Sequence, residues 1–133
     1  MACTVTGAPC IKFGANGIKL KLNGFIITGN GGRNSCTLNF TDTGIDTNLK
    51  NNVSIQGPGL VRRFNFVDIV VSGNNSMVEG VAIPSSCLEG IRVLGSNNEV
   101  ERNRSAGLVW ITVWWATSRR GYLSPHPEGT TGF

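Results

Sequence analysis

The chain is poor in the residues that most kinds of active site need. It has a single His, a single Tyr and no Cys-x-x-Cys pair, so a His-dependent catalytic triad and a Cys/His zinc site lack suitable residues. His126 lies between two prolines, and no Gly-x-Ser-x-Gly segment is present. The glycine-rich segment 29–33 is followed by neither a helical pattern nor a Lys-Ser/Thr pair, which excludes a phosphate loop of the P-loop kind.

Charge is also scarce. Only 15% of the 133 residues are charged and 40% are apolar, which excludes a disordered polar chain and predicts one folded domain. The net charge of +4 comes from short basic doublets with no interleaved aromatic residues, so no nucleic-acid partner is expected. The longest apolar run, 108–116, is less than half a membrane span, and no membrane partner is expected.

The chain lacks a long stretch without helix breakers, because 18 Gly and 14 Asn are distributed along it. An all-helical fold is therefore excluded. Cys3 and Cys10 flank a Gly-Ala-Pro turn, a spacing that suits a small disulfide loop and a protein of secreted or extracellular ancestry. The first residues show no signal peptide, since no basic start and apolar segment are present.

A repeat organises the middle of the chain. The segment 51–57, which begins Asn-Asn, recurs at 74–80 and again at 97–103, displaced by 23 positions each time. A fainter copy at 23–29 is displaced by 28, with the glycine-rich segment after it as a longer loop. A second motif precedes each copy: Gly17-Ile18-Lys19, Gly44-Ile45-Asp46, Asp68-Ile69-Val70 and Gly90-Ile91-Arg92.

Each repeat holds short β-type runs without a helix to carry a crossover, so the chain is expected to coil with each turn stacked on the last by parallel pairing. Asn tolerates the left-handed backbone of a bend, and stacked amides hydrogen-bond between turns. One column of Asn51, Asn74 and Asn97 is therefore expected, with Asn52, Asn75 and Asn98 beside it. The alternative is that Asn-Asn marks independent hairpin turns.

These rungs resemble those of right-handed parallel β-helix proteins of the pectate-lyase-like superfamily, in their Gly-Ile-x-Val and Asn-Asn-x-Val-x-x-Asn patterns. The resemblance covers about four rungs, and it implies an all-β right-handed parallel β-helix, a solenoid. We expect an N-terminal cap segment at 1–13, rungs at 14–107, and an atypical Trp-rich strand with an irregular tail at 108–133. The chain resembles the front of a longer protein, and the change after Ala106 is expected either from a tail read from an altered frame or from a genuine Trp-rich cap.

The repeat also predicts the interior. Seven positions past each motif lie Cys36, Phe64, Cys87 and Trp110, all apolar, as expected for an inward column. Cys36 and Cys87 then stand two rungs apart, about 10 Å, which exceeds the reach of a disulfide and predicts two buried free thiols.

The segment 108–115 reads as a strand too apolar to face water on either side. Its three Trp side chains need a partner surface, so we expect it to drive homo-oligomerisation through Trp110, Trp114 and Trp115. Folding back as a cap within one chain is the alternative.

Acidic residues carry the catalytic hypothesis. Asp46, Asp68 and Glu89 lie beside the Gly-Ile motif of successive rungs, where a coil brings neighbours to about 5 Å. Two such carboxyls suit retaining glycoside cleavage, or Asp46 and Asp68 hold Ca²⁺ as the cofactor of a polysaccharide elimination. Arg62 or Arg63 would stabilise negative charge beside Asp68. The alternative is a surface ladder of charges, with Lys19 and Arg92 as ion-pair partners.

The resemblance implies a carbohydrate-active module of the polysaccharide lyase or glycoside hydrolase type, partial and of weak or lost activity, with a polysaccharide as partner. The catalytic segments of polygalacturonase-type hydrolases and of pectate lyases are missing from this chain, so their catalytic residues do not carry over. A noncatalytic structural or glycan-binding solenoid is the second reading. Promiscuous ester hydrolysis in a pocket at an oligomer interface is the third.

Overall fold

The computed structural model describes residues 1–4, 7–31, 36–105 and 113–114. In these ranges the chain is all-β, contains no helix, and is built of short strands that pair only in parallel. This arrangement is a β-solenoid, as the repeat predicts, because successive equivalent segments stack without helical crossovers. The strands of the first half are β1 (Ile11–Lys12), β2 (Lys19–Lys21), β3 (Ile26–Thr28), β4 (Ile45–Asp46), β5 (Ser54–Gln56), β6 (Leu60–Arg62) and β7 (Val67–Val71). Those of the second half are β8 (Met77–Glu79), β9 (Ala82–Ile83), β10 (Glu89–Leu94), β11 (Glu99–Glu101), β12 (Arg104–Ser105) and β13 (Val113–Trp114).

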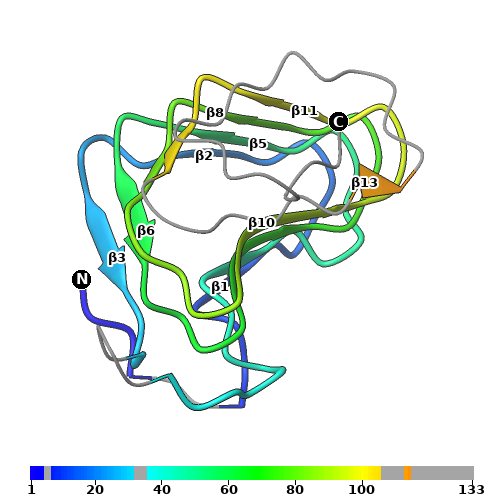
Figure 1. Cartoon of the computed structure of the whole chain (residues 1–133). Helices are drawn as coiled ribbons and strands as arrows, with labels where there is room; N and C mark the ends of the chain where they lie inside the picture. The colour runs from blue at the N-terminus through cyan, green and yellow to red at the C-terminus, as the bar shows by residue number, and fades with distance from the viewer. Residues whose placement is uncertain (5–6, 32–35, 106–112, 115–133) are drawn as a thin grey trace.

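Three parallel sheets form the faces of the coil (Figure 1). The first sheet has the order β1-β4-β7-β10-β13, the second β2-β5-β8-β11, and the third β3-β6-β9-β12. Strands of one sheet are therefore separated by a full lap of the chain. In Figure 1, β2, β5, β8 and β11 lie side by side along one face, and the N-terminus lies beside β3.

The laps differ in length. The bend of the second sheet advances by 23 residues from Asn51 to Asn74, and by 22 from Asn74 to Ser96. The first lap is far longer, since Asn16 lies 35 positions before its partner Asn51. The 23-residue period is thus correct for one lap and one residue too long for the next.

The first lap corrects the fainter repeat. Asn16, and not Asn23, occupies the position equivalent to Asn51. Ile18 likewise belongs to the second sheet, where its carbonyl accepts from Ser54 N–H, and Ile11 is the true partner of Ile45. A long excursion between β3 and β4 displaces every position before it, so a constant period misaligns the first lap.

Inward-facing positions form columns of aliphatic side chains. Ile55 and Val78 are fully buried in the second sheet, and Ile45, Ile69 and Ile91 are fully buried in the first. These columns merge into one contiguous hydrophobic cluster. The Gly-Ile motif therefore marks a core column from the second lap onward, because Ile stacks on Ile along the axis of the coil.

An asparagine column stands at one bend, with one substitution. Asn51 N–H donates to Asn16 Oδ1 at 2.9 Å, and Asn74 N–H donates to Asn51 Oδ1 at 2.9 Å. The next member is Ser96, whose N–H donates to Asn74 Oδ1 at 2.8 Å. The placement of Asn97 in this column is wrong, since the last lap is one residue shorter.

The neighbouring column has left-handed backbone. Asn52, Asn75 and Asn97 have φ values of 57°, 56° and 57°, and Gly17 in the same register has 74°. Asn and Gly are the residues that adopt this conformation at low cost. Backbone geometry thus explains the second Asn of the first two pairs, Asn52 and Asn75, and in the last pair the first member, Asn97, takes the place that the sequence predicts for Asn98.

Asn98 is instead buried, together with Asn103. Asn98 Oδ1 accepts from Ser76 N–H at 2.9 Å and its amide donates to the Gly73 carbonyl at 2.8 Å. Asn103 repeats this arrangement with Val81 N–H at 2.8 Å and the Val78 carbonyl at 3.0 Å. The two amides bracket β11 and satisfy backbone groups of the preceding lap.

Both disulfides connect the first lap to its surroundings. Cys3 and Cys10 are bonded, with Cα atoms 5.9 Å apart. Cys36 and Cys87 are also bonded, with Cα atoms 5.6 Å apart, so the prediction of two buried free thiols is wrong. The long excursion takes Cys36 out of the inward register and leaves it exposed. Of the predicted inward column, Phe64 is the one residue within the described ranges that is buried in the core.

The described part of the Trp-rich segment is short. Val113 and Trp114 form β13, which pairs in parallel with Val93 and Leu94 of β10 in the same chain. Strand formation is therefore correct at these two residues. Trp110 and Trp115 lie outside the described residues, and the oligomer contact through this segment stays a prediction.

Candidate functional site

The register separates the three acidic residues of the catalytic hypothesis. Asp46 pairs with Val70, and Val70 pairs with Arg92. Asp68 and Glu89 therefore stand one and two positions before the Ile column, whereas Asp46 stands one position after it. Asp46 is half-buried and its Oδ1 accepts from Asn48 N–H at 2.7 Å, which closes a local turn.

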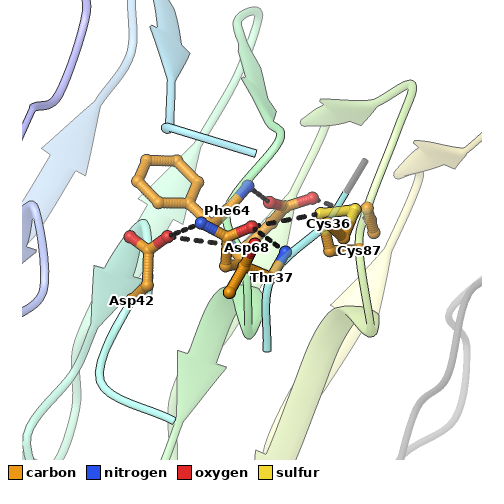
Figure 2. Close-up of a disulfide and its surroundings, with 8 residues drawn as sticks. Cys36, Thr37, Asp42, Phe64, Asp68 and Cys87 are labelled. Atoms are coloured by element: carbon orange, nitrogen blue, oxygen red, sulfur yellow. Dashed lines mark hydrogen bonds between the residues drawn. A yellow bond between two sulfur atoms is a disulfide. The ribbon is translucent and has the colours of Figure 1, made fainter. Parts of the chain in front are cut away.

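Asp68 is fully buried at a corner of the coil (Figure 2). Its carboxylate accepts from Phe64 N–H at 3.0 Å and from Ser86 Oγ at 2.7 Å. Desolvation by burial raises the pKa of Asp68 well above its ordinary value of 3.8, against the lowering effect of these two hydrogen bonds. The charge of nearby Asp42 raises the pKa further. Asp68 thus tethers the turn before β7 to the turn before β10.

A second buried acid supports the same corner. Asp42 is 1% exposed, and its Oδ2 accepts from the backbone N–H and the side-chain amide of Asn65 at 3.0 and 2.7 Å. Asn65 Oδ1 in turn accepts from Thr37 N–H at 3.1 Å and lies 3.8 Å from Cys87 Sγ. Figure 2 shows this network beside the Cys36–Cys87 disulfide. Its members hold the long excursion against the following laps.

The burial of Asp68 predicts a pH effect on stability. Because its folded-state pKa is raised, the protonated form favours the folded state, and this contribution is lost as the pH rises through that pKa. Asp68→Asn keeps an acceptor for Phe64 N–H and stays neutral. We expect its free energy of unfolding to exceed that of the wild type at neutral pH and to fall less between acidic and neutral pH.

Urea denaturation of both proteins across this pH range measures the difference. Asp46→Asn, which removes the same charge at a half-buried position, is the control and should keep the wild-type slope. Parallel profiles of wild type and Asp68→Asn would contradict the prediction.

Glu89 is buried and forms an ion pair with Arg92 of the same strand, β10. Arg92 Nε and Nη2 donate to the two carboxylate oxygens of Glu89 at 2.7 and 2.6 Å, a bidentate arrangement. The hydrogen bonds with Glu89 raise the pKa of Arg92. The alternative is correct in making Arg92 an ion-pair partner, but Asp68 and Glu89 are buried and form no surface ladder.

Aromatic side chains adjoin this pair. The Arg92 guanidinium carbon lies 4.5 Å from the centre of the Phe66 ring, a cation–π contact. Phe66 meets Phe40 edge to face, with ring centres 5.3 Å apart, and Phe40 is 69% exposed. We call Phe40, Phe66, Glu89 and Arg92 the aromatic–arginine surface.

The two arginines of the catalytic hypothesis, Arg62 and Arg63, form different contacts, and neither contact is with Asp68 in the described residues. Arg62 Nε donates to Thr28 Oγ1 at 3.2 Å, which joins β6 to β3. Arg63 has a positive φ of 62°, and its backbone bonds to Gly31 and Ser85. Within the described residues, neither arginine forms an ion pair with Asp68.

Neither a metal-binding cluster nor a membrane-spanning helix is found among the described residues. In those ranges no group of three or more His, Cys, Asp or Glu side chains is arranged to hold a metal ion. The same part of the chain has no helix with the length and apolarity needed to cross a membrane. A calcium role for Asp46 and Asp68 stays a prediction.

The sequence hypothesis missed Phe40 and Phe66. The one signal in the sequence concerns Phe66, which immediately precedes β7. The strand paired with β7 in the next lap is β10, which contains Glu89 and Arg92 three positions apart. Phe40 belongs to the irregular excursion, where no repeat position exists to compare it with. Such contacts depend on the path of the excursion.

Comparison with known proteins finds nothing similar: no protein family, no curated protein and no solved structure matches this chain. The class that the fold defines is an all-β solenoid of stacked parallel sheets.

Proposed function

We propose that this protein is a right-handed parallel β-helix of the pectate-lyase-like kind that binds an acidic polysaccharide without cleaving it. The parallel sheets and the laps of 22 and 23 residues support the fold assignment. Solenoids of this kind present long, flat faces to extended ligands.

The aromatic–arginine surface carries the proposal. It combines an exposed ring, Phe40, with a second ring held between that ring and a guanidinium. Sugar rings offer apolar C–H faces, which pack on aromatic rings, and hydroxyl groups, which accept from N–H donors. Glu89 takes two of the five N–H groups of Arg92 and fixes its plane, so the arginine is oriented before a ligand arrives.

The placement of the acids supports binding over cleavage. Retaining hydrolysis needs two carboxyl groups about 5–5.5 Å apart on either side of the bond that breaks. Asp68 is enclosed and hydrogen-bonded, Glu89 is paired with Arg92, and Asp46 lies on the opposite side of the Ile column in register. Each carboxylate already has a structural task.

The charge of the chain supports an acidic ligand. The net charge is +4, which attracts polyanions at moderate ionic strength. Uronic-acid polymers supply both carboxylates and sugar faces. The proposal therefore predicts tighter binding to such a polymer than to a neutral one of equal length.

The test is titration calorimetry with polygalacturonate oligomers. We expect saturable binding that Phe40→Ala and Arg92→Ala each weaken about tenfold, the loss of about one aromatic or charged contact. Leu49→Ala removes a comparably exposed apolar side chain elsewhere and should bind as the wild type does.

Release of unsaturated uronates in the same samples separates the two classes of function. No release together with saturable binding supports the proposal. Release that a chelator abolishes would instead establish a calcium-dependent lyase. Equal binding by the Phe40→Ala variant and the wild type would overturn the assignment of binding to the aromatic–arginine surface.

A further inference from the structure

The first lap of the coil borders an apolar hollow. Its three strands, β1, β2 and β3, are each an outermost strand of their sheet. The hollow beside them has a volume of about 310 Å³, a size at the lower end of the range for small-molecule sites. All three strands and the chain next to them supply its apolar lining, which consists of Met1, Ile11, Leu20, Leu22, Phe25 and Ile27.

The lining includes side chains of the core columns that the first lap leaves partly uncovered. Ile11 and Leu20 are half-buried, whereas their partners in the next lap, Ile45 and Ile55, are fully buried. Phe25 is 68% exposed and also lines the hollow. A ligand with an apolar part would remove this surface from water, which favours binding.

The hollow has positive charge beside it. Lys21 is the one charged side chain among its described lining residues, and Lys19 is exposed on the same strand. In register these lysines lie beside Gln56 and Ser54 of β5, which are uncharged. The first acidic residue of the whole sequence is Asp42, so the segment 1–28 contributes no negative charge. This arrangement suits a ligand that is apolar along its length and anionic at one end.

We propose that the hollow binds a medium-chain fatty acid, with its hydrocarbon tail against Leu20, Phe25 and Ile27 and its carboxylate at Lys21. A fatty-acid carboxylate is ionised at neutral pH and accepts from an ammonium group. The tail covers the apolar lining, and each methylene that it buries tightens binding about fourfold. A second copy that met this end with its own first lap would bring the lysines of both copies together, so the charge favours the fatty acid as the occupant.

Titration calorimetry of the full chain with hexanoate, octanoate and decanoate tests the tail. We expect saturable binding of octanoate with a dissociation constant below about 1 mM, and binding at least about tenfold tighter than that of hexanoate. Octanol has the same number of carbons without the charge, and it should bind about threefold more weakly than octanoate.

Two variants with matched controls locate the site. Phe25→Ala removes an exposed lining side chain and should weaken octanoate binding about fivefold, whereas Leu49→Ala, at an exposed position outside the lining, should leave it unchanged. Lys21→Gln should weaken octanoate binding about threefold and leave octanol binding unchanged. Lys50→Gln removes the same charge outside the lining and should change neither.

The fatty-acid site and the aromatic–arginine surface can fail independently. Neither Phe25 nor Lys21 belongs to that surface, so Phe25→Ala and Lys21→Gln should bind polygalacturonate oligomers within about twofold of the wild type. Circular dichroism of each variant reports whether the fold is kept.

Several results would overturn the fatty-acid proposal. One is the absence of saturable octanoate binding up to about 1 mM, and another is an affinity that does not depend on tail length. Equal octanoate binding by the wild type and Phe25→Ala would also overturn it, as would octanol binding as tight as that of octanoate. So would a stable dimer, measured by sedimentation velocity, that octanoate neither binds nor dissociates.

Discussion

Replacing Cys36 and Cys87 together by alanine is expected to lower the free energy of unfolding by about 4 kcal/mol. The disulfide closes a loop of 51 residues, and cross-linking so long a loop removes much of the entropy of the unfolded chain. Cys36 is exposed and Cys87 is half-buried, so little packing is lost with the side chains. The long excursion of the first lap is then held by the hydrogen bonds of Asp42 and Asn65 and by the contact between Phe40 and Phe66.

The matched control is replacement of Cys3 and Cys10 by alanine. That pair closes a loop of seven residues, so the same model of loop entropy gives about 2 kcal/mol. Urea denaturation of the two double variants, with the wild type in the presence and absence of a reductant, measures both terms. An equal or smaller loss for the Cys36 and Cys87 variant would contradict the expectation.

Asn98→Leu is expected to destabilise the fold by about 2–6 kcal/mol. Leu has nearly the same shape, but it leaves Ser76 N–H and the Gly73 carbonyl buried without partners, at about 1–3 kcal/mol each. The effect should be largest in the last lap, where Asn98 immediately precedes β11. Asn103→Leu repeats the test at the other end of that strand, on Val81 N–H and the Val78 carbonyl.

Asn30→Leu makes the same chemical change at an exposed position and should stay within about 0.5 kcal/mol of the wild type. Chemical denaturation measures all three variants. Hydrogen exchange adds a local readout, since the amide of Ser76 should lose protection in Asn98→Leu. Full protection of that amide in the variant would show that the asparagine is not its partner.

Much of the fold could be predicted from local patterns. Parallel stacking without helices follows from short β-forming runs that recur between Asn and Gly bends. The pairing of Asn51 with Asn74 also follows from the repeat. These features depend on a local pattern that recurs at a nearly constant spacing from one lap to the next.

Register could not be predicted where the laps change length. One residue fewer in the last lap moves Asn97 into the left-handed column and Asn98 into the interior. The longer first lap makes Asn16 the partner of Asn51 and brings Cys36 to Cys87. A slip of one position turns a strand side chain to the opposite face, so small errors of counting reverse burial.

For the candidate site residues, too, the sequence indicated the position along the chain but not the neighbours in space. Asp46, Asp68 and Glu89 recur near the motif in sequence, but each was assigned to a shared cluster by counting alone, and the register gives each a different neighbour. The aromatic–arginine surface joins the irregular excursion to two laps of the first sheet. The repeat of the sequence does not predict these contacts, because the excursion has no equivalent in the other laps.

The amino-acid sequence by itself determined that this chain coils, because a repeated pattern of β-formers and bends stabilises the same local shape at every lap. Only the tertiary structure decided which side chains meet across laps, because these contacts depend on the number of residues in each lap and on the path of the excursion. The oppositely charged strands Lys19–Lys21 and Glu99–Glu101 are legible in the sequence, yet their common columns emerge only from the three-dimensional register.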